Sequence, residues 1–453
     1  MKLCNWYLLA ICSFICSLIS CGSEDPFFTE EGFETVALER QINNVQPMTG
    51  LVLWPTHGGK DRYANVITLE FQYCLPCRVV TGKQDGALQY DWSYLEKILN
   101  DIQSRGHQAI IRFRYEYPNN SDVDKNNRGA TAVPQYIKDL PDYTETYSKN
   151  PGGDGPTYYA DWSHPELQWF TKQFYSDFAA RYNADSRIAF IELGFGHWSE
   201  YHTYGTPVKL GKNFPSKAYQ KEFLMHINQV LDIPWAISID AADTGYSPIV
   251  EDAALMALPF GLFDDSFMHE HHEIRQGDGY NETCWREIGQ DKRWHQGVCG
   301  GEVSYYEDSD QRNFLNPEGM YGVIWEDAAA KYHISFMIAN DAPGGIYGNV
   351  NRFKEAGMAC GYNLRVLQCK TNGTETRLSV TNEGIAPLYR DAFFAIEDTQ
   401  STTSLRGLLP QDTCNITIPK GLVNENDLHI VSPHILPTQQ IEFNASIPTD
   451  NKN

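Results

Sequence analysis

Two glutamates stand where the chain has the residue types for cleaving a glycosidic bond. Glu200 lies in the segment 194–202 and Glu302 in the segment 297–306, and each follows a short apolar run typical of a barrel strand. Glycosidic cleavage needs one carboxyl group that protonates the leaving oxygen and a second that attacks the sugar or activates water. Carboxyl groups about 5–5.5 Å apart indicate retention and about 6.5–9.5 Å inversion. We expect a retaining site with Glu302 as nucleophile and Glu200 as acid/base.

Glu302 follows Gly300 and Gly301 at the end of its predicted strand. Glycines there allow close backbone approach and would leave room for a bound sugar ring. The alternative is a structural glutamate that forms an ion pair with an arginine such as Arg112. Both interpretations place the carboxylate inside the barrel.

Glu200 has aromatic neighbours that favour a general acid. Trp198 with His197 and His202 would raise its pKa by desolvation or orient it by hydrogen bonding. The alternative is a loop glutamate that faces solvent. Glu192, on the same segment, lies mid-strand and is expected to be a buried structural partner.

Ionisable and amide residues gather at the predicted strand ends, and such groups are costly to bury unless they are paired or functional. The set comprises His57, Glu70, Arg112, Arg114, His197, Glu200, His202, Asp240, Asp243, Asp264, Asp265, His269, Glu302, Asn340 and Asp341. We expect sugar subsites lined by Trp54, His197, Trp198, His202, Asp240, Asp265 and His269.

Arg112 and Arg114 alternate with apolar residues along one predicted strand, so both point to the same face. If that face is the barrel interior, they would bind a carboxylate or sulfate of the substrate. Alternatively they are the counter-ions of Glu192 or Glu302. With Tyr115 as a base, the same arginines would instead suit a polysaccharide lyase.

Other chemistries find little support. The run His269-Glu-His-His-Glu273 does not have the spacing of a zinc-binding helix, so we expect no metal. The Gly-x-Ser-x-Gly turn of a serine hydrolase is absent from the sequence. We expect no cofactor.

The elements that must position these residues alternate between apolar strands and amphipathic helices, which is typical of βα repetition. Strands are predicted at 51–54, 66–73, 108–115, 187–195, 235–239, 260–263, 296–303 and 334–346, and helices at 91–105, 163–182, 216–231 and 319–332. A capping box is predicted at residues 163–166, and residues 119–155 read as an insertion at the catalytic face. The fold class is therefore α/β, a (β/α)8 TIM barrel over residues 45–356.

Residues 357–453 differ in style from the barrel. Short strands are predicted at 364–368, 376–380, 392–396, 415–418 and 428–431, with turn residues and no helical stretch between them. This pattern indicates a small antiparallel β-sandwich.

The N-terminal residues predict export. An apolar stretch ends in Leu18-Ile-Ser-Cys21-Gly, which resembles a bacterial lipoprotein cleavage box. We expect a signal peptide at 1–20, lipidation at Cys21, an acidic tether at 21–44, and a place in the cell envelope, at the bacterial outer membrane. An ordinary secretory signal is the alternative.

Composition narrows the partners. With 36 basic and 58 acidic residues, nucleic acid and anionic membrane surfaces are disfavoured. Aromatic residues make up 13% of the chain, which suits stacking on sugar rings. An oxidising compartment would favour local disulfides such as Cys284 with Cys299, and Cys74 and Cys77 are either a structural disulfide or two inert thiols.

Several motifs together resemble a bacterial family whose members carry a domain of unknown function. They are Asn44-Val-Gln-Pro47, Gly50-Leu-Val-Leu-Trp54, Gly194-Phe-Gly-His-Trp-Ser-Glu-Tyr-His202, Phe263-Asp-Asp-Ser266, Gly300-Gly-Glu302 and Asn382-Glu-Gly-Ile-Ala-Pro-Leu-Tyr-Arg390. The resemblance implies a glycosidase-like TIM barrel followed by a β-sandwich. The chain is also distantly similar to retaining glycosidases, whose nucleophile ends strand seven, as Glu302 would. Their acid/base glutamate ends strand four, whereas Glu200 comes later, in a Gly-rich loop.

Taken together, these features predict an exported, lipid-anchored glycoside hydrolase that acts on a poly- or oligosaccharide. Its first rival is a non-catalytic glycan-binding lipoprotein that uses the barrel as a scaffold. The lyase is the second rival. Oligomeric state, sugar and linkage have no signal in the sequence.

Overall fold

The computed structural model describes residues 26–149, 154–304, 306–307, 309–339 and 349–448. The predicted signal peptide 1–20, Cys21, Asn340 and Asp341 lie outside these residues. In the described part of the chain, no helix is both long and apolar enough to cross a membrane.

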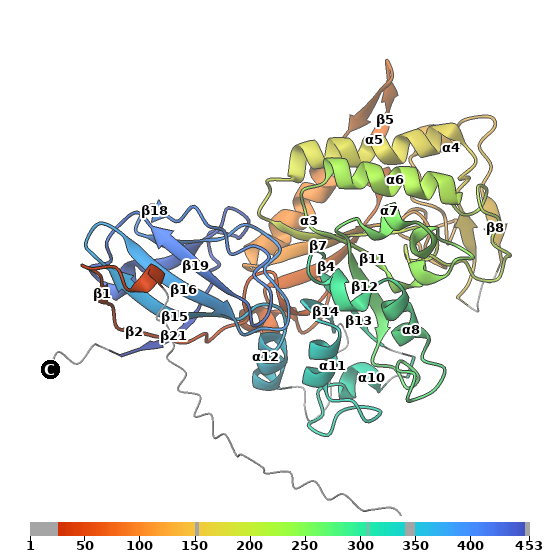
Figure 1. The fold of residues 1–453 in the computed structure, drawn as a ribbon. Coiled ribbons are helices and arrows are strands. Elements are labelled where there is room, and N and C mark those ends of the chain that lie inside the picture. Colours follow the sequence, from red (N-terminus) through yellow and green to blue (C-terminus); the bar gives the residue numbers. More distant parts are fainter. Residues whose placement is uncertain (1–25, 150–153, 305, 308, 340–348, 449–453) are drawn as a thin grey trace, which may run out of the picture.

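The larger body is an eight-stranded parallel barrel (Figure 1). Its strands in chain order are β3 (Gly50–Val52), β4 (Leu69–Cys74), β7 (Gln108–Phe113), β10 (Ile188–Leu193), β11 (Trp235–Ser238), β12 (Gly261–Phe267), β13 (Cys299–Val303) and β14 (Phe336–Ile338). They pair in the order β3-β14-β13-β12-β11-β10-β7-β4. The ring closes where the Phe71 amide donates to the Leu53 carbonyl at 3.0 Å. The predicted TIM-barrel fold class is confirmed.

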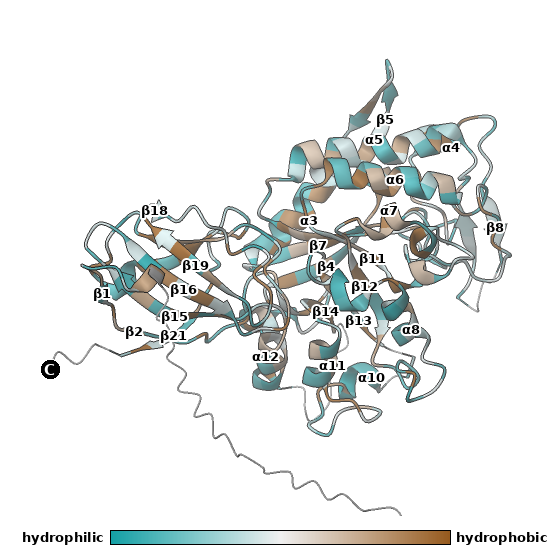
Figure 2. Ribbon diagram, in the orientation of Figure 1, coloured by the Kyte–Doolittle hydropathy of each residue, from teal (hydrophilic) through white to brown (hydrophobic). Residues whose placement is uncertain are grey.

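Alternation along each strand divides the side chains between the barrel interior and the surrounding helices. The rings of Phe190 on β10 and Phe336 on β14 stack inside the barrel, with centroids 5.6 Å apart. Phe71, Ile110 and Phe263 belong to the same buried cluster. Figure 2 shows the strands as mainly hydrophobic, whereas the outer helices carry mixed faces.

The helices form where an apolar stripe can pack on the barrel. The larger ones are α3 (Ser93–Ser104), α5 (Pro165–Tyr182), α6 (Lys217–Val230), α8 (Tyr280–Glu287), α11 (Trp325–Lys331) and α12 (Val350–Met358). Helix α3 buries Leu95, Leu99 and Ile102 as its periodicity predicts. The cap of α5 differs from the predicted box, because the His164 ring, rather than the residue before it, accepts from the Glu166 amide at 3.1 Å.

Short elements fill the loops. They are α1 (Lys60–Tyr63), α2 (Pro76–Val79), α4 (Gln135–Lys138), α7 (Ala253–Met256), α9 (Gln290–Arg293), α10 (Asp310–Asn313), the 3-10 turns η1 (Pro26–Phe28), η2 (Ala64–Val66), η4 (Ile239–Ala242), η5 (Ile249–Glu251) and η6 (Glu425–Asp427), and the hairpins β5 (Val80–Gln84) with β6 (Ala87–Tyr90) and β8 (Thr146–Ser148) with β9 (Thr157–Tyr159). The predicted insertion at 119–155 thus carries its own structure, α4 and β8, rather than forming one irregular loop.

The smaller body is built from two sheets whose strands pair antiparallel, except for the parallel pair β15 (Leu364–Thr371) and β21 (Asn444–Ile447). The first contains β15, β16 (Thr376–Asn382), β19 (Thr413–Ile418) and β21, and the second contains β17 (Phe393–Ile396), β18 (Thr399–Gln400) and β20 (Leu428–Val431). The first sheet also takes two N-terminal strands, β1 (Glu34–Thr35) against β15 and β2 (Leu38–Arg40) against β21. Part of the expected acidic tether 21–44 is therefore a structural part of this domain, because its charged residues alternate with the buried Leu38 and half-buried positions.

The β-domain packs against the loops that precede the barrel strands, at the end opposite the predicted site (Figure 1). The Tyr362 hydroxyl donates to the Pro47 carbonyl at 3.0 Å, just before β3. The Tyr389 hydroxyl donates to the Trp294 carbonyl at 2.6 Å, and Arg390 donates to the Asp232 carbonyl at 2.9 Å. The domain therefore seals the amino-terminal end of the barrel.

The disulfide expected between Cys284 and Cys299 is wrong, because both residues are buried free thiols. Cys284 lies on α8, whereas the Cys299 thiol points from β13 toward the Gly297 carbonyl. Cys74 and Cys77 are also free, and burial raises the pKa of each thiol, which makes both unreactive.

The contact of Arg390 with the barrel predicts a stability effect. Arg390→Ala removes a buried guanidinium that bonds the carbonyls of Asp232 and Asn183, so we expect a loss of about 2 kcal/mol in the free energy of unfolding. Urea denaturation measures it. The exposed Arg406→Ala is the control and should change this free energy by less than about 0.5 kcal/mol. Equal effects of the two substitutions would contradict the proposed role of the contact.

Candidate active site

Arg112 on β7 is the centre of the polar end of the barrel. Its side chain is fully buried, and its Nη2 and Nε lie 2.5 and 2.7 Å from one carboxylate oxygen of Glu192. Its Nη1 lies 2.7 Å from Asp265 and 3.3 Å from Glu200. The guanidinium also lies over the Phe263 ring, 4.0 Å from the centroid, so it rests on the apolar barrel core. The predicted pairing of Arg112 with Glu192 is present.

Several acidic side chains surround Arg112, whose single positive charge cannot neutralise all of them. Desolvation raises the pKa of Glu200 well above its usual range, and the nearby Asp265 carboxyl raises it further. Desolvation and Asp265 likewise raise the pKa of Glu302. Burial raises the pKa of Glu192 to about 7, although Arg112 opposes this shift. The surroundings of Arg112 therefore favour the protonated form of these carboxyl groups.

Glu200 reaches Arg112 because the chain folds back after β10. Gly194 and Gly196 allow this turn, since a side chain at Gly194 would meet the Ser199 carbonyl at 1.7 Å and one at Gly196 would meet the His202 carbonyl at 2.2 Å. Trp198, Ser199 and Tyr201 have left-handed φ angles of 49°, 67° and 63°. Such residues mark a backbone held in a costly conformation by its surroundings.

The alternative of a solvent-facing Glu200 is wrong, because only 16% of its side chain is exposed.

Glu302 points into the barrel from β13 and is 7% exposed. The glycines before it have a role other than the expected one. A side chain at Gly300 would meet the Phe336 ring at 2.5 Å, and one at Gly301 would meet the Asp264 carbonyl at 2.0 Å. They allow close strand packing, so the interior space expected for a sugar ring is filled by Phe336.

The outer layer of the site carries His202 and Asp240. The His202 Nδ1 lies 3.0 Å from the Asp240 carboxylate, and both side chains are partly exposed. Ring centroids of Tyr204 and His202 lie 4.4 Å apart. Trp198 packs edge-on to His202, with centroids 5.9 Å apart.

Three exposed tyrosines lie near the site, and the apolar pattern of the sequence does not predict them as site residues. Tyr204, Tyr280 and Tyr306 are 39%, 47% and 70% exposed. Desolvation raises the pKa of each phenol and the Asp240 carboxylate raises it further, so all three tyrosines lie near Asp240. They stand in loops and at a helix start, where apolar periodicity says nothing about their direction.

Trp54 and His269 take different places at the same end. The Trp54 ring packs against Tyr73 with centroids 5.2 Å apart. The His269 ring lies 5.1 Å from that of Tyr306 and forms a 2.9 Å hydrogen bond with Asn281. Both side chains remain partly exposed.

Three expected site residues do not face the site opening. His197 is fully buried, with Nε2 2.6 Å from the Tyr159 hydroxyl, and burial lowers its pKa to about 3. Arg114 is 2% exposed and donates to Asp122 at 2.7 Å, so it is not open to a substrate anion. Tyr115 points outward, because it is one position out of phase with Arg112 and Arg114, and packs on Trp162. The lyase interpretation thereby loses its base.

Other members of the strand-end set have local roles. Glu70 forms an ion pair with Arg105 and hydrogen-bonds His107 outside the barrel interior. The side chains of His57 and Asp243 accept from nearby backbone amides of turns.

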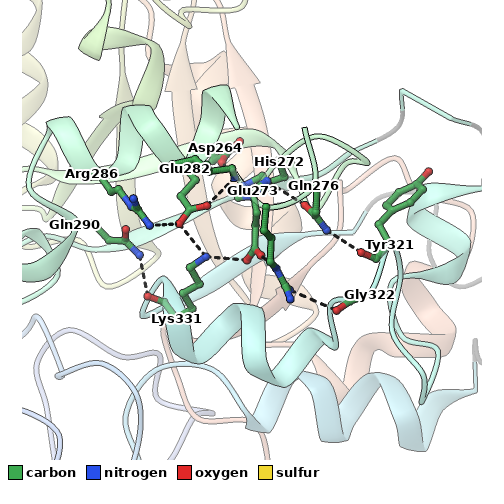
Figure 3. A network of polar contacts seen from close by, with 12 residues as sticks. Asp264, His272, Glu273, Gln276, Glu282, Arg286, Gln290, Tyr321, Gly322 and Lys331 are labelled. Atoms are coloured by element: carbon green, nitrogen blue, oxygen red, sulfur yellow. Dashed lines mark hydrogen bonds and ion pairs between the residues drawn. The ribbon is translucent and has the colours of Figure 1, made fainter. Parts of the chain in front are cut away.

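Residues of the run 269–273 make separate structural contacts and do not face one another as ligands of one metal ion. Figure 3 shows the contacts of His272 and Glu273. His272 Nε2 bonds Asp264 at 2.9 Å, and Glu273 pairs with Arg275 and Lys331. Asp264 also accepts from Trp285. Because Asp264 and Asp265 are consecutive on β12, one points outward to this network and the other inward to Arg112.

The raised pKa of Glu302 predicts a pH-dependent stability difference. In the folded state Glu302 holds a proton that the unfolded chain releases above about pH 4.3, so each further pH unit costs the native protein up to about 1.4 kcal/mol until the folded pKa is reached. Glu302→Gln lacks this cost, so its stability relative to the native sequence should rise from pH 5 to pH 8. Urea titrations at each pH measure it. The exposed Glu270→Gln should show no such trend, and a pH-independent difference for Glu302→Gln would refute the shift.

No family model matches the sequence. No curated protein matches it either. Among solved structures, the catalytic domain of a β-amylase from Paenibacillus polymyxa has a TM-score of 0.41 at 12% identity, over 69% of this chain and 99% of that one. A family 39 glycoside hydrolase from Bacteroides cellulosilyticus has a TM-score of 0.38 at 11% identity, over 84% and 82%. A lactosyl-enzyme intermediate of endo-glycoceramidase II from Rhodococcus has a TM-score of 0.37 at 10% identity, over 85% and 100%. None of these values is high enough to transfer an activity to this chain.

Proposed function

We propose that the chain is a retaining glycoside hydrolase with Glu302 as nucleophile and Glu200 as general acid/base. The observation that carries this proposal is that two carboxyl groups, Glu302 on β13 and Glu200 in the loop after β10, both interact with Arg112 and both have pKa values raised by desolvation. Both lie at the carboxyl ends of the barrel strands, where TIM-barrel enzymes place their catalytic residues.

Glu200 has the environment of a general acid. Desolvation raises its pKa and so favours the protonated form that a general acid needs, and its partly exposed side chain can reach a leaving oxygen. After the first step the same carboxylate would take a proton from the attacking water, as retention requires.

Glu302 must ionise to attack. In the free protein its pKa is raised by burial and by the acids near it. A sugar ring that develops positive charge in the transition state would supply the missing counter-charge beside the carboxylate. Arg112 forms ion pairs with Asp265 and Glu192. These ion pairs reduce the electrostatic repulsion between Glu302 and the neighbouring acids before the substrate binds.

The substrate is a poly- or oligosaccharide in this proposal, and Trp198, His202, Asp240, Asp265, His269 and Trp54 are the residues available for subsites. Tyr204, Tyr280 and Tyr306 join them, because exposed aromatic rings can stack on sugars. We also propose export and lipid attachment at Cys21, on the cleavage box at residues 18–22.

Replacing the nucleophile tests the proposal. The purified protein is first screened against plant and algal polysaccharides in heavy-oxygen water, where hydrolysis adds two mass units to the product and a lyase leaves an unsaturated one. On the substrate found, Glu302→Gln should lower kcat at least about 10³-fold, with binding retained and the melting temperature not lowered. Glu270→Gln is the matched control. Unchanged kcat in Glu302→Gln, or binding without turnover by the native protein, would overturn the proposal.

The variant Glu200→Gln should distinguish the general acid from the nucleophile. A general acid is needed most when the leaving group is poor, so this variant should lose about 10²–10⁴-fold on the native glycan and much less on an aryl glycoside with an acidic phenol. Initial rates on the two substrate types measure the difference. An equal loss on both would argue against Glu200 as the acid.

A further inference from the structure

Glu200, His202 and Asp240 bring three potential ligand atoms together at the site. One nitrogen of His202 and one carboxylate oxygen of each acid all lie within 4.8 Å of one another. Each side chain is partly exposed, with 16%, 13% and 21% of its surface accessible, so an ion can enter from solvent.

The local backbone holds these groups in place. His202 pairs with Gly196 across the folded-back loop, where the His197 amide donates to the His202 carbonyl at 3.0 Å. Asp240 is the second residue of the 3-10 turn η4, and its amide donates to the Ser238 hydroxyl at 3.1 Å. The backbone positions of His202 and Asp240 are therefore fixed by hydrogen bonds before an ion binds.

One buried atom at the cluster lacks a partner. His202 uses Nδ1 toward Asp240, and its Nε2 is buried without a hydrogen-bond partner in the part of the chain that is described. Asp265, whose side chain is 7% exposed, hydrogen-bonds the Glu200 carboxyl group, so a further carboxyl group lies beside the cluster. Buried polar atoms left without partners cost free energy, and a bound ion would remove that cost.

The donor set selects the kind of ion. One imidazole with two or three carboxylates suits Zn²⁺ and similar first-row divalent ions, whereas Ca²⁺ and Mg²⁺ prefer oxygen alone. Zn²⁺ binds nitrogen and oxygen at about 2.0–2.2 Å, so the three side chains would need to close slightly around it.

We propose that Glu200, His202 and Asp240 form a binding site for a divalent transition-metal ion, with Zn²⁺ the best match. Because the ion would take the carboxylate of Glu200, it would block the acid/base group. This regulatory consequence, unlike the binding itself, rests on the proposed function.

Calorimetric titration of Zn²⁺ into chelator-treated protein, made without a histidine tag, tests the site. We expect one equivalent to bind, and His202→Ala and Asp240→Asn each to weaken the affinity at least tenfold. His271→Ala removes an exposed histidine nearby and should leave the affinity unchanged. Circular dichroism and melting temperature check that each variant is folded, and either variant alone suffices if the other does not fold.

Cobalt gives a second readout. Co²⁺ in the site should give a visible absorption band that Zn²⁺ abolishes and that His202→Ala lacks. Absence of saturable Zn²⁺ binding, or binding retained in both His202→Ala and Asp240→Asn, would overturn the site.

Inhibition separates the two proposals. If both hold, Zn²⁺ should inhibit hydrolysis with a midpoint that matches its dissociation constant. Binding that is lost in the variants but does not inhibit would keep the metal site and refute the acid/base role of Glu200.

Discussion

The structure of the site depends on one buried guanidinium. Arg112 is removed from water completely, and such a charge is stable in a protein interior only with close counter-ions. Glu192 supplies one on the neighbouring strand β10, and Asp265 supplies another from β12. These partners come from strands that are far apart in the sequence, so the polar layer can form only when the barrel has closed.

Arg112 also separates two environments inside the barrel. Below it the interior is apolar, with Phe71, Phe190 and Phe336, and the β-domain covers that end. Above it lie the acids and the aromatic side chains that remain partly exposed. Stability and chemistry are thereby placed at opposite ends of the strands, an arrangement general to TIM barrels.

Strand alternation explains which parts of this site were predictable. All eight barrel strands follow from apolar runs, and the inward direction of Arg112 follows from its phase with the residues around it. The same rule separates Asp265 from Asp264. By contrast, β1 and β2 are too short and too charged to show a period, and they exist because β15 and β21 offer free edges. His197 has no periodic signal, and its buried ring hydrogen-bonds Tyr159 on β9, which comes from a distant part of the sequence.

The position of Glu200 illustrates the limit of sequence spacing. It lies eight positions after Glu192, a distance over which an extended chain would run well past the strand end. The loop instead returns, at the cost of left-handed angles at Trp198, Ser199 and Tyr201, each worth on the order of 1–3 kcal/mol. The Tyr201 amide, which donates to the Phe195 carbonyl at 2.9 Å, helps to hold the turn. A loop that only connected β10 to α6 would not need this strain. The strained conformation of this loop brings the carboxyl group of Glu200 to Arg112, which is why we assign the loop a function.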